Sequence, residues 1–331
     1  MADSPAILHF AELLRSAKLN GSLELSKRTV NVLSKVVRDC NVNSVEGLID
    51  LVRSSGNVLI RSRPQELVIG NIVRRFLSII RGIALENGPD DPTIYGTSDE
   101  HLMALVNSEM RETISLEIAE LFGEIDLTLT NITQYAVDHI HSNEVILTFG
   151  ESSSVSAFLI AGGSSRNISV IVAESGPKKY GYTMCQQLAK HGIQTTLIPD
   201  SHVYAVMPSV NKVVFGTQAV LADGGLLGFT GSHNIAACAR SHAVPVIVVA
   251  GIYKFSPLYA FNQDTLNAHN KPSDILSYED KCSTQVHIYN PAFDYVPSTY
   301  IALFVTNVGP YHPSYIYRLL SEVYNQADLD L

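Results

Sequence analysis

The sequence predicts an α/β protein with an N-terminal all-helical domain, residues 1–140, and a Rossmann-like, doubly wound, mostly parallel sheet domain, residues 141–331. Two observations support this division. Up to about residue 140, apolar residues recur at three- and four-residue steps, as in amphipathic helices. From Glu144 onward, short β-branched runs alternate with intervals long enough for a helix, and parallel strands need such helical crossovers.

Four apolar stripes predict the first helices. The first runs from Ile7 to Leu19 and the second from Val30 to Val37. Asn43-Ser44 is a capping start for a third helix, VEGLIDLV, and Pro64 suits the first turn of a fourth. The stripe of this fourth helix consists of Leu67, Val68, Ile72, Phe76, Ile79 and Ile80.

The next segment, 87–99, is dense in Gly, Pro and Asp and predicts a loop, to which the sequence assigns no role. Ser98 is expected to cap one long helix whose apolar positions continue to Val137. His139 and His141 follow where this helix ends. Alternate residues share a face only on a strand, so this histidine pair predicts no metal site.

Five short runs predict strands of the second domain: EVILTFG, SVIVAES, QTTLIPD, KVVFGTQ and VPVIVVA. Continuous apolar runs of this kind are typical of strands buried on both faces. The segment PAFDYVPSTYIALFVTN and a final helix, YIYRLLSEVY, complete the domain. In such folds, ligands lie beyond the carboxyl ends of the strands.

Composition excludes several classes of function. The net charge is −9, and binding along nucleic-acid phosphates needs a basic face, so we expect no direct nucleic-acid binding. Cys40, Cys185, Cys238 and Cys282 lie far apart without metal-ligand spacing, which predicts reduced, mostly buried thiols. The N-terminus lacks a secretory pattern, and the apolar runs are too short to span a bilayer. We therefore expect a cytosolic protein without membrane contact.

Two motifs of α/β enzymes are incomplete. After the first strand, a dinucleotide site would need several glycines, but Gly150 is followed by Glu151 and a serine run. A carboxylate there would repel pyrophosphate at the helix N-terminus, so we expect no NAD, FAD or other cofactor, and the serines are expected to cap the helix. The tripeptide Gly231-Ser232-His233 resembles part of a nucleophile elbow without its spacing.

The helical part contains a basic run in which Glu66 is the single acid: Arg53, Arg61, Arg63, Arg74, Arg75 and Arg81. The favoured interpretation is a solvated helix face. The alternative is a docking surface for an acidic or phosphorylated partner, because guanidinium forks suit phosphate and carboxylate. The candidates for that surface are Arg61, Arg63, Arg74 and Arg75.

Several sequence blocks together carry a family resemblance. HSNEVILTFG, NKVVFGTQAVLADGG, FDYVPSTYIALFVTNVG and PSYIYRLLSEVY closely resemble the beta-subunit family of eukaryotic translation initiation factor two B. The resemblance covers nearly the whole chain, including RPQELVIGNIVRRFLSIIR. That complex is the guanine-nucleotide exchange factor for initiation factor two. Its regulatory subunits are related to sugar-phosphate isomerases that act on methylthioribose-1-phosphate and ribose bisphosphate.

The resemblance implies that the loop VVFGTQAVLADGGLLG is a degenerate isomerase site. Gly150 stands where the isomerases have a catalytic cysteine, Gln218 where they have an acid–base aspartate, and Gly228-Phe229 where an Asn-Lys pair holds substrate. Moving protons between carbon and oxygen atoms needs groups that ionise near neutrality, which glycine and glutamine lack. We therefore expect no catalysis. The pocket residues are Gly150, Glu151, Ser152, Gln218, Asp223, Gly228 and Phe229.

The resemblance also implies partners. A subunit of this family pairs with the delta subunit, joins the alpha, gamma and epsilon subunits in a decamer, and helps to sense the phosphorylated alpha subunit of initiation factor two. Obligate interfaces are large and apolar, so the interface candidates are Asn143, Tyr295, Phe304, Tyr315 and Tyr317. Two alternatives remain open, an active sugar-phosphate isomerase and a subunit that senses a small molecule in the old pocket.

Overall fold

The computed structural model describes residues 4–16, 19, 21–86, 106–260, 266–283 and 285–331. The chain divides into two compact units, Met1–Leu127 with Arg318–Leu331, and Thr128–Tyr317. We call them the helical unit and the α/β unit. The domain boundary expected between residues 140 and 141 stays a prediction. The two compact units meet along the chain at other points, between Leu127 and Thr128 and between Tyr317 and Arg318.

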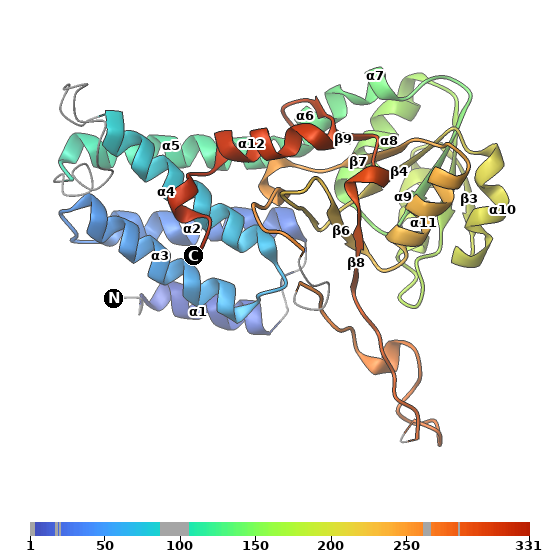
Figure 1. Ribbon diagram of the computed structural model, residues 1–331, viewed down its shortest axis with the longest axis horizontal. Helices are drawn as coiled ribbons and strands as arrows, with labels where there is room; N and C mark the ends of the chain where they lie inside the picture. Colours follow the sequence, from blue (N-terminus) through green and yellow to red (C-terminus); the bar gives the residue numbers. More distant parts are fainter. Residues whose placement is uncertain (1–3, 17–18, 20, 87–105, 261–265, 284) are drawn as a thin grey trace. The chain divides into compact units, whose positions relative to one another are not determined.

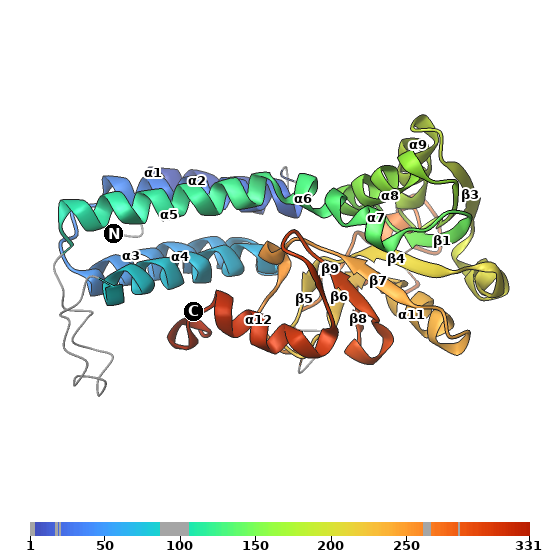
Figure 2. The same cartoon turned by 90° about the horizontal axis from the view of Figure 1, so that it is seen from above.

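In the described part of the helical unit, five long helices run alongside one another (Figures 1 and 2). They are α1 (Pro5–Arg15), α2 (Ser22–Asp39), α3 (Val45–Ser62), α4 (Leu67–Glu86) and α5 (Ser108–Asp126). All four predicted helices are present, although the first ends at Arg15, before Leu19, and the fourth begins at Leu67, after Pro64. The stripe residues Val30, Leu33 and Phe76 are buried. Burying each such side chain contributes about 1.5–3 kcal/mol to stability. As expected, Ser44 caps α3, its side chain accepting a hydrogen bond from the Gly47 amide at 3.2 Å.

The prediction of one long helix from Ser98 to Val137 is wrong. The Asn107 side chain accepts a hydrogen bond from the Met110 amide at 2.7 Å, so α5 begins at Ser108 and ends at Asp126. Two short helices follow, α6 (Thr128–Gln134) and α7 (Ala136–His139). Asparagine favours such a cap over a helix interior because its side chain competes for backbone hydrogen bonds. The predicted loop 87–99, with Ser98, lies outside the described residues.

A mostly parallel, seven-stranded sheet forms the centre of the α/β unit, as expected. Its strand order is β10-β9-β7-β4-β1-β2-β3, and all its pairs are parallel except β9 with β10. All five predicted strands are present. The strands are β1 (Glu144–Phe149), β2 (Ile168–Ala173), β3 (Gln194–Ile198), β4 (Lys212–Gly216), β7 (Val246–Val249), β9 (Leu303–Val305) and β10 (Pro310–Tyr311).

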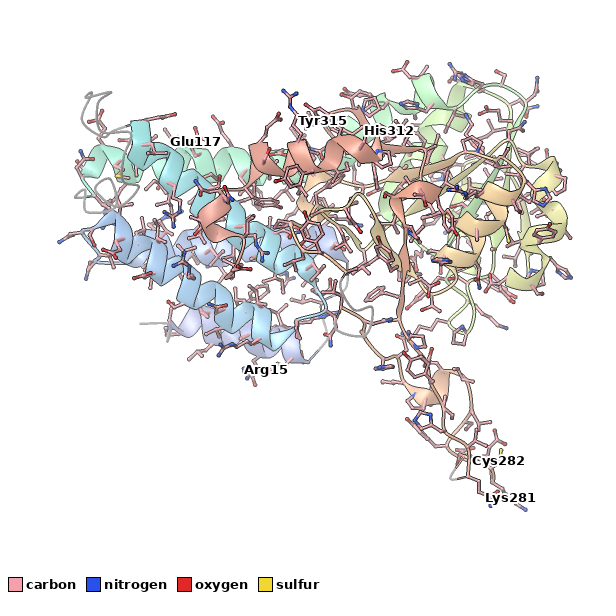
Figure 3. All side chains as sticks on the ribbon, in the orientation of Figure 1. Arg15, Glu117, Lys281, Cys282, His312 and Tyr315 are labelled. Carbon is pink, nitrogen blue, oxygen red and sulfur yellow. The ribbon has the colours of Figure 1, made fainter. Side chains whose placement is uncertain are left out.

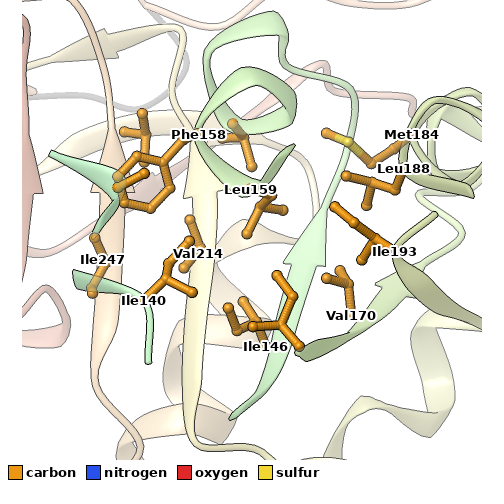
Figure 4. Close-up of a cluster of buried hydrophobic side chains, with 14 of the residues drawn as sticks. Ile140, Ile146, Phe158, Leu159, Val170, Met184, Leu188, Ile193, Val214 and Ile247 are labelled. Atoms are coloured by element: carbon orange, nitrogen blue, oxygen red, sulfur yellow. The ribbon is translucent and has the colours of Figure 1, made fainter. Parts of the chain in front are cut away.

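Helices cover both faces of this sheet (Figure 2). α8 (Ser153–Ser165) and α9 (Tyr180–Lys190) pack on one face together with α6 and α7. Phe158, Leu159, Met184 and Leu188 from these helices meet Ile146 and its neighbours on the strands (Figure 4). α11 (Ser232–Ser241) packs on the other face, and α10 (Val203–Val206) precedes β4. This doubly wound arrangement confirms the predicted fold class.

A second, antiparallel sheet was not predicted. It consists of β5 (Ala219–Val220), β6 (Leu226–Phe229) and β8 (Phe293–Val296), in that order. These strands have two to four residues, too few to give a clear periodic pattern. Before β8, a segment projects from the α/β unit, with Lys281 and Cys282 near its far end (Figure 3). The chain then continues to α12 (Ile316–Val323), the predicted final helix.

Three expectations on composition can be compared with the structure. In the described part of the chain, no helix is both long and apolar enough to cross a membrane. Over the same ranges, no three His, Cys, Asp or Glu side chains gather as metal ligands would. The cysteines are free thiols, but the expectation that they are mostly buried is wrong, since Cys282 is exposed and the other three are half-buried. Burial raises the pKa of the Cys185 and Cys238 thiols, which disfavours the reactive thiolate.

Candidate functional site

The candidate site lies where β1 and β4 end at the same edge of the main sheet. The two strands pair in parallel, so the segments after Phe149 and Gly216 leave the sheet side by side. Ser152 joins them. Its side chain caps α8 by accepting a hydrogen bond from the Val155 amide at 3.4 Å, and a Cβ on Gly216 would lie 2.6 Å from its Oγ. Serine capping of this helix, predicted from the sequence, is confirmed by this hydrogen bond.

Gly150 lies against the aromatic ring of Phe229. Its backbone has φ +73°, and a Cβ at this position would lie only 2.8 Å from Phe229 Cδ2. The Phe229 ring in turn contacts Tyr180 and Phe293, at centroid distances of 5.4 and 6.4 Å. A cysteine at residue 150 would therefore adopt a strained backbone conformation and collide with this ring. The neighbouring Glu151 is exposed to solvent.

Gln218 begins the loop that leads into the second sheet. Its amide donates a hydrogen bond to the Leu227 carbonyl at 2.8 Å, and its side chain is half-buried. The preceding Thr217 hydroxyl lies within hydrogen-bond distance of the Ala219 and Leu227 carbonyls. Buried Lys254 donates to the Thr217 carbonyl at 2.8 Å. Hydrogen bonds to backbone carbonyls thus hold the loop. The side-chain amide of Gln218 does not titrate in the pH range in which an acid–base carboxylate would.

Asp223 is engaged in a turn. One carboxylate oxygen accepts a hydrogen bond from the Gly225 amide at 2.9 Å, and the other accepts one from the Tyr295 hydroxyl. Burial, together with the hydrogen bond to Asp223 and its negative charge, raises the pKa of Tyr295 well above its usual value. Tyr295 therefore stays protonated and donates. The pair connects the 223–225 turn to β8.

Gly228 and the Gly-Ser-His tripeptide lie at the start of α11. A Cβ on Gly228 would lie 2.5 Å from Ser232 Oγ, so only glycine fits beside this serine. Asp294 of β8 accepts hydrogen bonds from the Gly231 and His233 amides, at 2.7 and 3.4 Å, and so satisfies the helix N-terminus. His233 Nδ1 lies 2.8 Å from the Tyr295 carbonyl, so it donates there. This ring holds β8 against α11.

The structure thus brings together some predicted pocket residues and gives others separate roles. Gly150 and Phe229 touch each other, as their expected common pocket requires, while Asp223 is hydrogen-bonded to Tyr295 and Gly228 lies against Ser232. Sequence reasoning missed the residues that surround them, because these come from distant parts of the chain. They are Tyr180, Lys254, Phe293 and Asp294. No short-range pattern marks them, although Phe293 and Asp294 fall inside the block FDYVPSTY.

The arginine run lies in the helical unit, and most of its members make intramolecular contacts. Arg74 is 5% exposed, and its guanidinium donates to the Leu329 carbonyl. Arg63 pairs with Glu66 at 3.0 Å, and Arg75 with Glu124 at 3.0 Å. Arg61, by contrast, is exposed. A solvated face is therefore the wrong interpretation for Arg74. The hypothesis that the arginine run binds a partner stays a prediction, and Arg61 is the exposed one of its four candidate residues.

The interface candidates differ in exposure. Tyr317 is 68% exposed, and Tyr315, half-buried, stacks on Tyr311 with a centroid distance of 5.5 Å and an interplanar angle of 4°. Figure 3 shows where Tyr315 lies on the surface. Asn143 is exposed, at a turn with φ +63°. Phe304, however, is fully buried in β9 against Phe255, so its ring cannot contact another subunit.

Comparisons of the sequence identify related proteins along the whole chain. A model of the initiation factor 2 subunit family matches residues 18–313. Over 376 aligned residues, the chain is 35% identical to translation initiation factor eIF2B subunit beta of Dictyostelium discoideum, covering 98% of this chain and 95% of that protein. The same subunit of Schizosaccharomyces pombe is 33% identical, with coverages of 98% and 97%. Ribose 1,5-bisphosphate isomerase of Methanocaldococcus jannaschii is 25% identical, with coverages of 98% and 97%.

Solved structures give the same result. The crystal structure of eIF2B beta from Chaetomium thermophilum matches with a TM-score of 0.75 and 27% identity, covering 98% of this chain and 91% of that one. A chain of the tetrameric eIF2B-beta2-delta2 complex from C. thermophilum matches with a TM-score of 0.74 and 28% identity, with coverages of 96% and 94%. The resemblance expected from the sequence blocks is confirmed.

The contact between residue 150 and Phe229 can be tested against a matched glycine. Gly192 has φ +76° but open space around its Cβ position, so Gly192→Ala carries only backbone strain, about 1–2 kcal/mol. Gly150→Ala should lower the free energy of unfolding by more than this, because its methyl group also meets Phe229. The Gly150→Ala/Phe229→Ala double variant lacks the collision. Its loss of unfolding free energy, measured by urea denaturation, should therefore be smaller than the sum of the losses in the two single variants by about 1 kcal/mol or more. Additive losses would contradict the contact.

Proposed function

Because the chain belongs to the initiation factor 2 subunit family, we propose that it works as a non-catalytic, beta-type regulatory subunit of the guanine-nucleotide exchange factor for translation initiation factor two. In this role it binds a delta subunit and shares the complex with alpha, gamma and epsilon subunits in the cytosol. Nucleotide exchange takes place in the epsilon subunit. The full-length relatedness to eIF2B beta proteins and the match to a beta2-delta2 complex support the proposal.

The observation that carries the non-catalytic part is the packing of Phe229 on Gly150. Aldose–ketose isomerisation needs an acid and a base that exchange protons with adjacent carbon and oxygen atoms, and each such group contributes about 10²–10⁴-fold to the rate. Residue 150 carries no side chain and residue 218 carries an amide. Asp223, a carboxylate of this loop, is bound by Tyr295 and the Gly225 amide. The site therefore lacks the groups the reaction needs.

The small-molecule-sensing alternative receives less support from the same geometry. The ring of Phe229 lies beside Gly150, and the rings of Tyr180 and Phe293 contact Phe229 in turn. A phosphate ligand needs cations and amide donors instead. Lys178 lies over the Tyr180 ring, but its ammonium already binds Asn270 Oδ1 at 2.6 Å and Asp274 at 3.7 Å.

Sensing of the phosphorylated alpha subunit of initiation factor two is assigned to the helical unit. We carry forward Arg61 as the candidate contact, since its guanidinium is exposed, whereas Arg63 and Arg75 are engaged with Glu66 and Glu124. Pairing with the delta subunit is assigned to the surface around Tyr315 and Tyr317 in the α/β unit.

The first prediction is an absence of isomerase activity. Purified chain incubated with ribose 1,5-bisphosphate should form product no faster than a protein-free sample, because both acid–base positions are lost. The M. jannaschii isomerase serves as the positive control. Turnover within about 10⁴-fold of that enzyme would overturn the non-catalytic assignment, since losing even one group costs up to that factor.

The second prediction concerns the delta interface. Tyr317→Ala should weaken assembly with a delta-type subunit about 30-fold, or about 2 kcal/mol, because a buried interface tyrosine contributes that much. Tyr278→Ala is the matched control, since Tyr278 is 67% exposed against 68% for Tyr317 but lies on the projecting segment. Native mass spectrometry of co-expressed subunits measures the assembled fraction. Equal fractions in both variants would move the interface elsewhere.

The third prediction concerns the phosphorylated partner. Within the reconstituted exchange factor, Arg61→Ala should weaken binding of the phosphorylated alpha subunit of initiation factor two about tenfold, because an arginine–phosphate contact is charge-assisted. Arg15→Ala is the control, because Arg15 on α1 is also an exposed arginine, and it should leave this affinity unchanged. Fluorescence anisotropy at two salt concentrations measures both. Unchanged affinity in Arg61→Ala would remove the arginine run from the binding surface.

A further inference from the structure

The segment that projects from the α/β unit before β8 is fixed at its base. We define this projecting segment as residues 266–283 and 285–292. At the base, the Asn270 amide donates a hydrogen bond to the Asn290 carbonyl at 2.8 Å, and the Asn270 side chain accepts one from Lys178 at 2.6 Å. The rest of the segment extends away from the α/β unit (Figure 3). The base thus holds the segment in place while its tip stands apart from the sheet and its helices.

The tip contains an exposed serine in a turn. Ser277, Tyr278, Glu279 and Asp280 are all exposed, and they belong to neither a helix nor a strand. The Asp280 amide donates to the Ser277 carbonyl at 3.1 Å, and the Glu279 amide donates to Ser277 Oγ at 3.3 Å. Exposed turns held by a few such bonds open at little cost in free energy. An enzyme can therefore bind the Ser277 hydroxyl and the residues after it in an extended conformation without disturbing the sheet.

The charges around Ser277 form a one-sided pattern. Glu279 and Asp280 follow it two and three residues on, whereas none of the five residues before it is an arginine or lysine. In an extended chain, the third residue lies about 10 Å beyond the serine. An enzyme with cations at that distance from its catalytic centre would bind these carboxylates, and protein kinases choose substrates through charge patterns of this kind. The pattern favours a kinase that recognises acidic residues after the acceptor hydroxyl.

Few other hydroxyls of the chain have this pattern. An acidic residue lies three positions after Thr97, Thr148 and Ser277, and after no other serine or threonine. Thr97 lies outside the described residues, and Thr148 is fully buried in β1. The same spacing also occurs in helix capping boxes. No helix follows Ser277, however, and its Oγ binds the amide two residues on instead of three, so capping does not account for the pattern here.

We propose that Ser277 is a phosphorylation site for an acidophilic serine kinase that uses MgATP. In this reaction Ser277 Oγ forms a bond to the γ-phosphorus of ATP, and the bond from that phosphorus to the bridging oxygen breaks. ADP leaves with the electron pair, and the hydroxyl proton passes to the catalytic aspartate of the kinase. The phosphate adds a charge of about −1.5 to −2 at pH 7 beside Glu279 and Asp280, so the tip becomes strongly acidic. The proposal does not depend on the function proposed above.

The test incubates the folded, full-length chain with casein kinase 2 and MgATP and maps phosphopeptides by mass spectrometry. Phosphate should appear at Ser277 and approach one group per chain, and Ser277→Ala should abolish it. Ser283 is the internal control, because it lies on the same segment but no acidic residue follows it within three positions. Protein kinase A, which needs basic residues before the acceptor, should leave Ser277 unmodified.

A charge variant tests whether the carboxylates direct the reaction. The Glu279→Gln/Asp280→Asn double variant keeps the hydroxyl and changes exposed residues alone, so far-UV circular dichroism should match the wild type. Its kcat/KM for phosphorylation should fall about tenfold or more, because two charge-assisted contacts to the kinase are lost. An unchanged kcat/KM would overturn recognition through these carboxylates.

Three further outcomes would overturn the proposal. The first is the absence of phosphate at Ser277 in the wild-type chain, and the second is its appearance only after heat denaturation, which would show that the folded turn is inaccessible. The third comes from the same incubation with the chain purified from its cells together with its bound partners. Phosphate transfer to the isolated chain but not to this assembly would mean that a partner covers the tip.

Discussion

The α/β unit depends on one constraint, the parallel pairing of β1 with β2 on one side and β4 on the other. Parallel strands place all their carboxyl ends at one edge, so the segments after Phe149 and Gly216 meet although they lie far apart in the sequence. Helices must cover both faces of such a sheet, which accounts for α8, α9 and α11. The second sheet, β5-β6-β8, then places Phe229 over the end of β1.

At that edge, side chains pack closely against three glycines. Gly150, Gly216 and Gly228 each have a side chain within 3 Å of where a Cβ would lie. The polar groups of the region stabilise the structure itself, as when Asp294 satisfies the start of α11 and Tyr295 binds Asp223. An enzyme site keeps titratable groups available to substrate, whereas these are used for internal contacts.

The helical unit uses charge in a similar way. Six arginines in this part of the chain would usually be interpreted as an exposed basic run. Arg53 and Arg81, however, bind the Asp328 carboxylate, and Arg74 donates to the Leu329 carbonyl. Their partners lie some 250 residues further along the chain, so no local pattern in 53–81 reveals them. The free energy of a buried carboxylate that is paired on both oxygens depends on all the cations that bind it.

The sequence by itself determined the first four helices, the five parallel strands of the main sheet that it predicted and the family, because apolar periodicity and β-branched runs follow from local geometry and the blocks that carry the resemblance are contiguous. It also determined that residues 150 and 218 cannot exchange protons, since side-chain chemistry is read directly from residue type. The tertiary structure alone decided which side chains meet: Phe229 on Gly150, Tyr295 on Asp223, and three arginines on residues 328 and 329. Such contacts depend on long-range pairing of strands and helices, and short sequence windows carry no information about it.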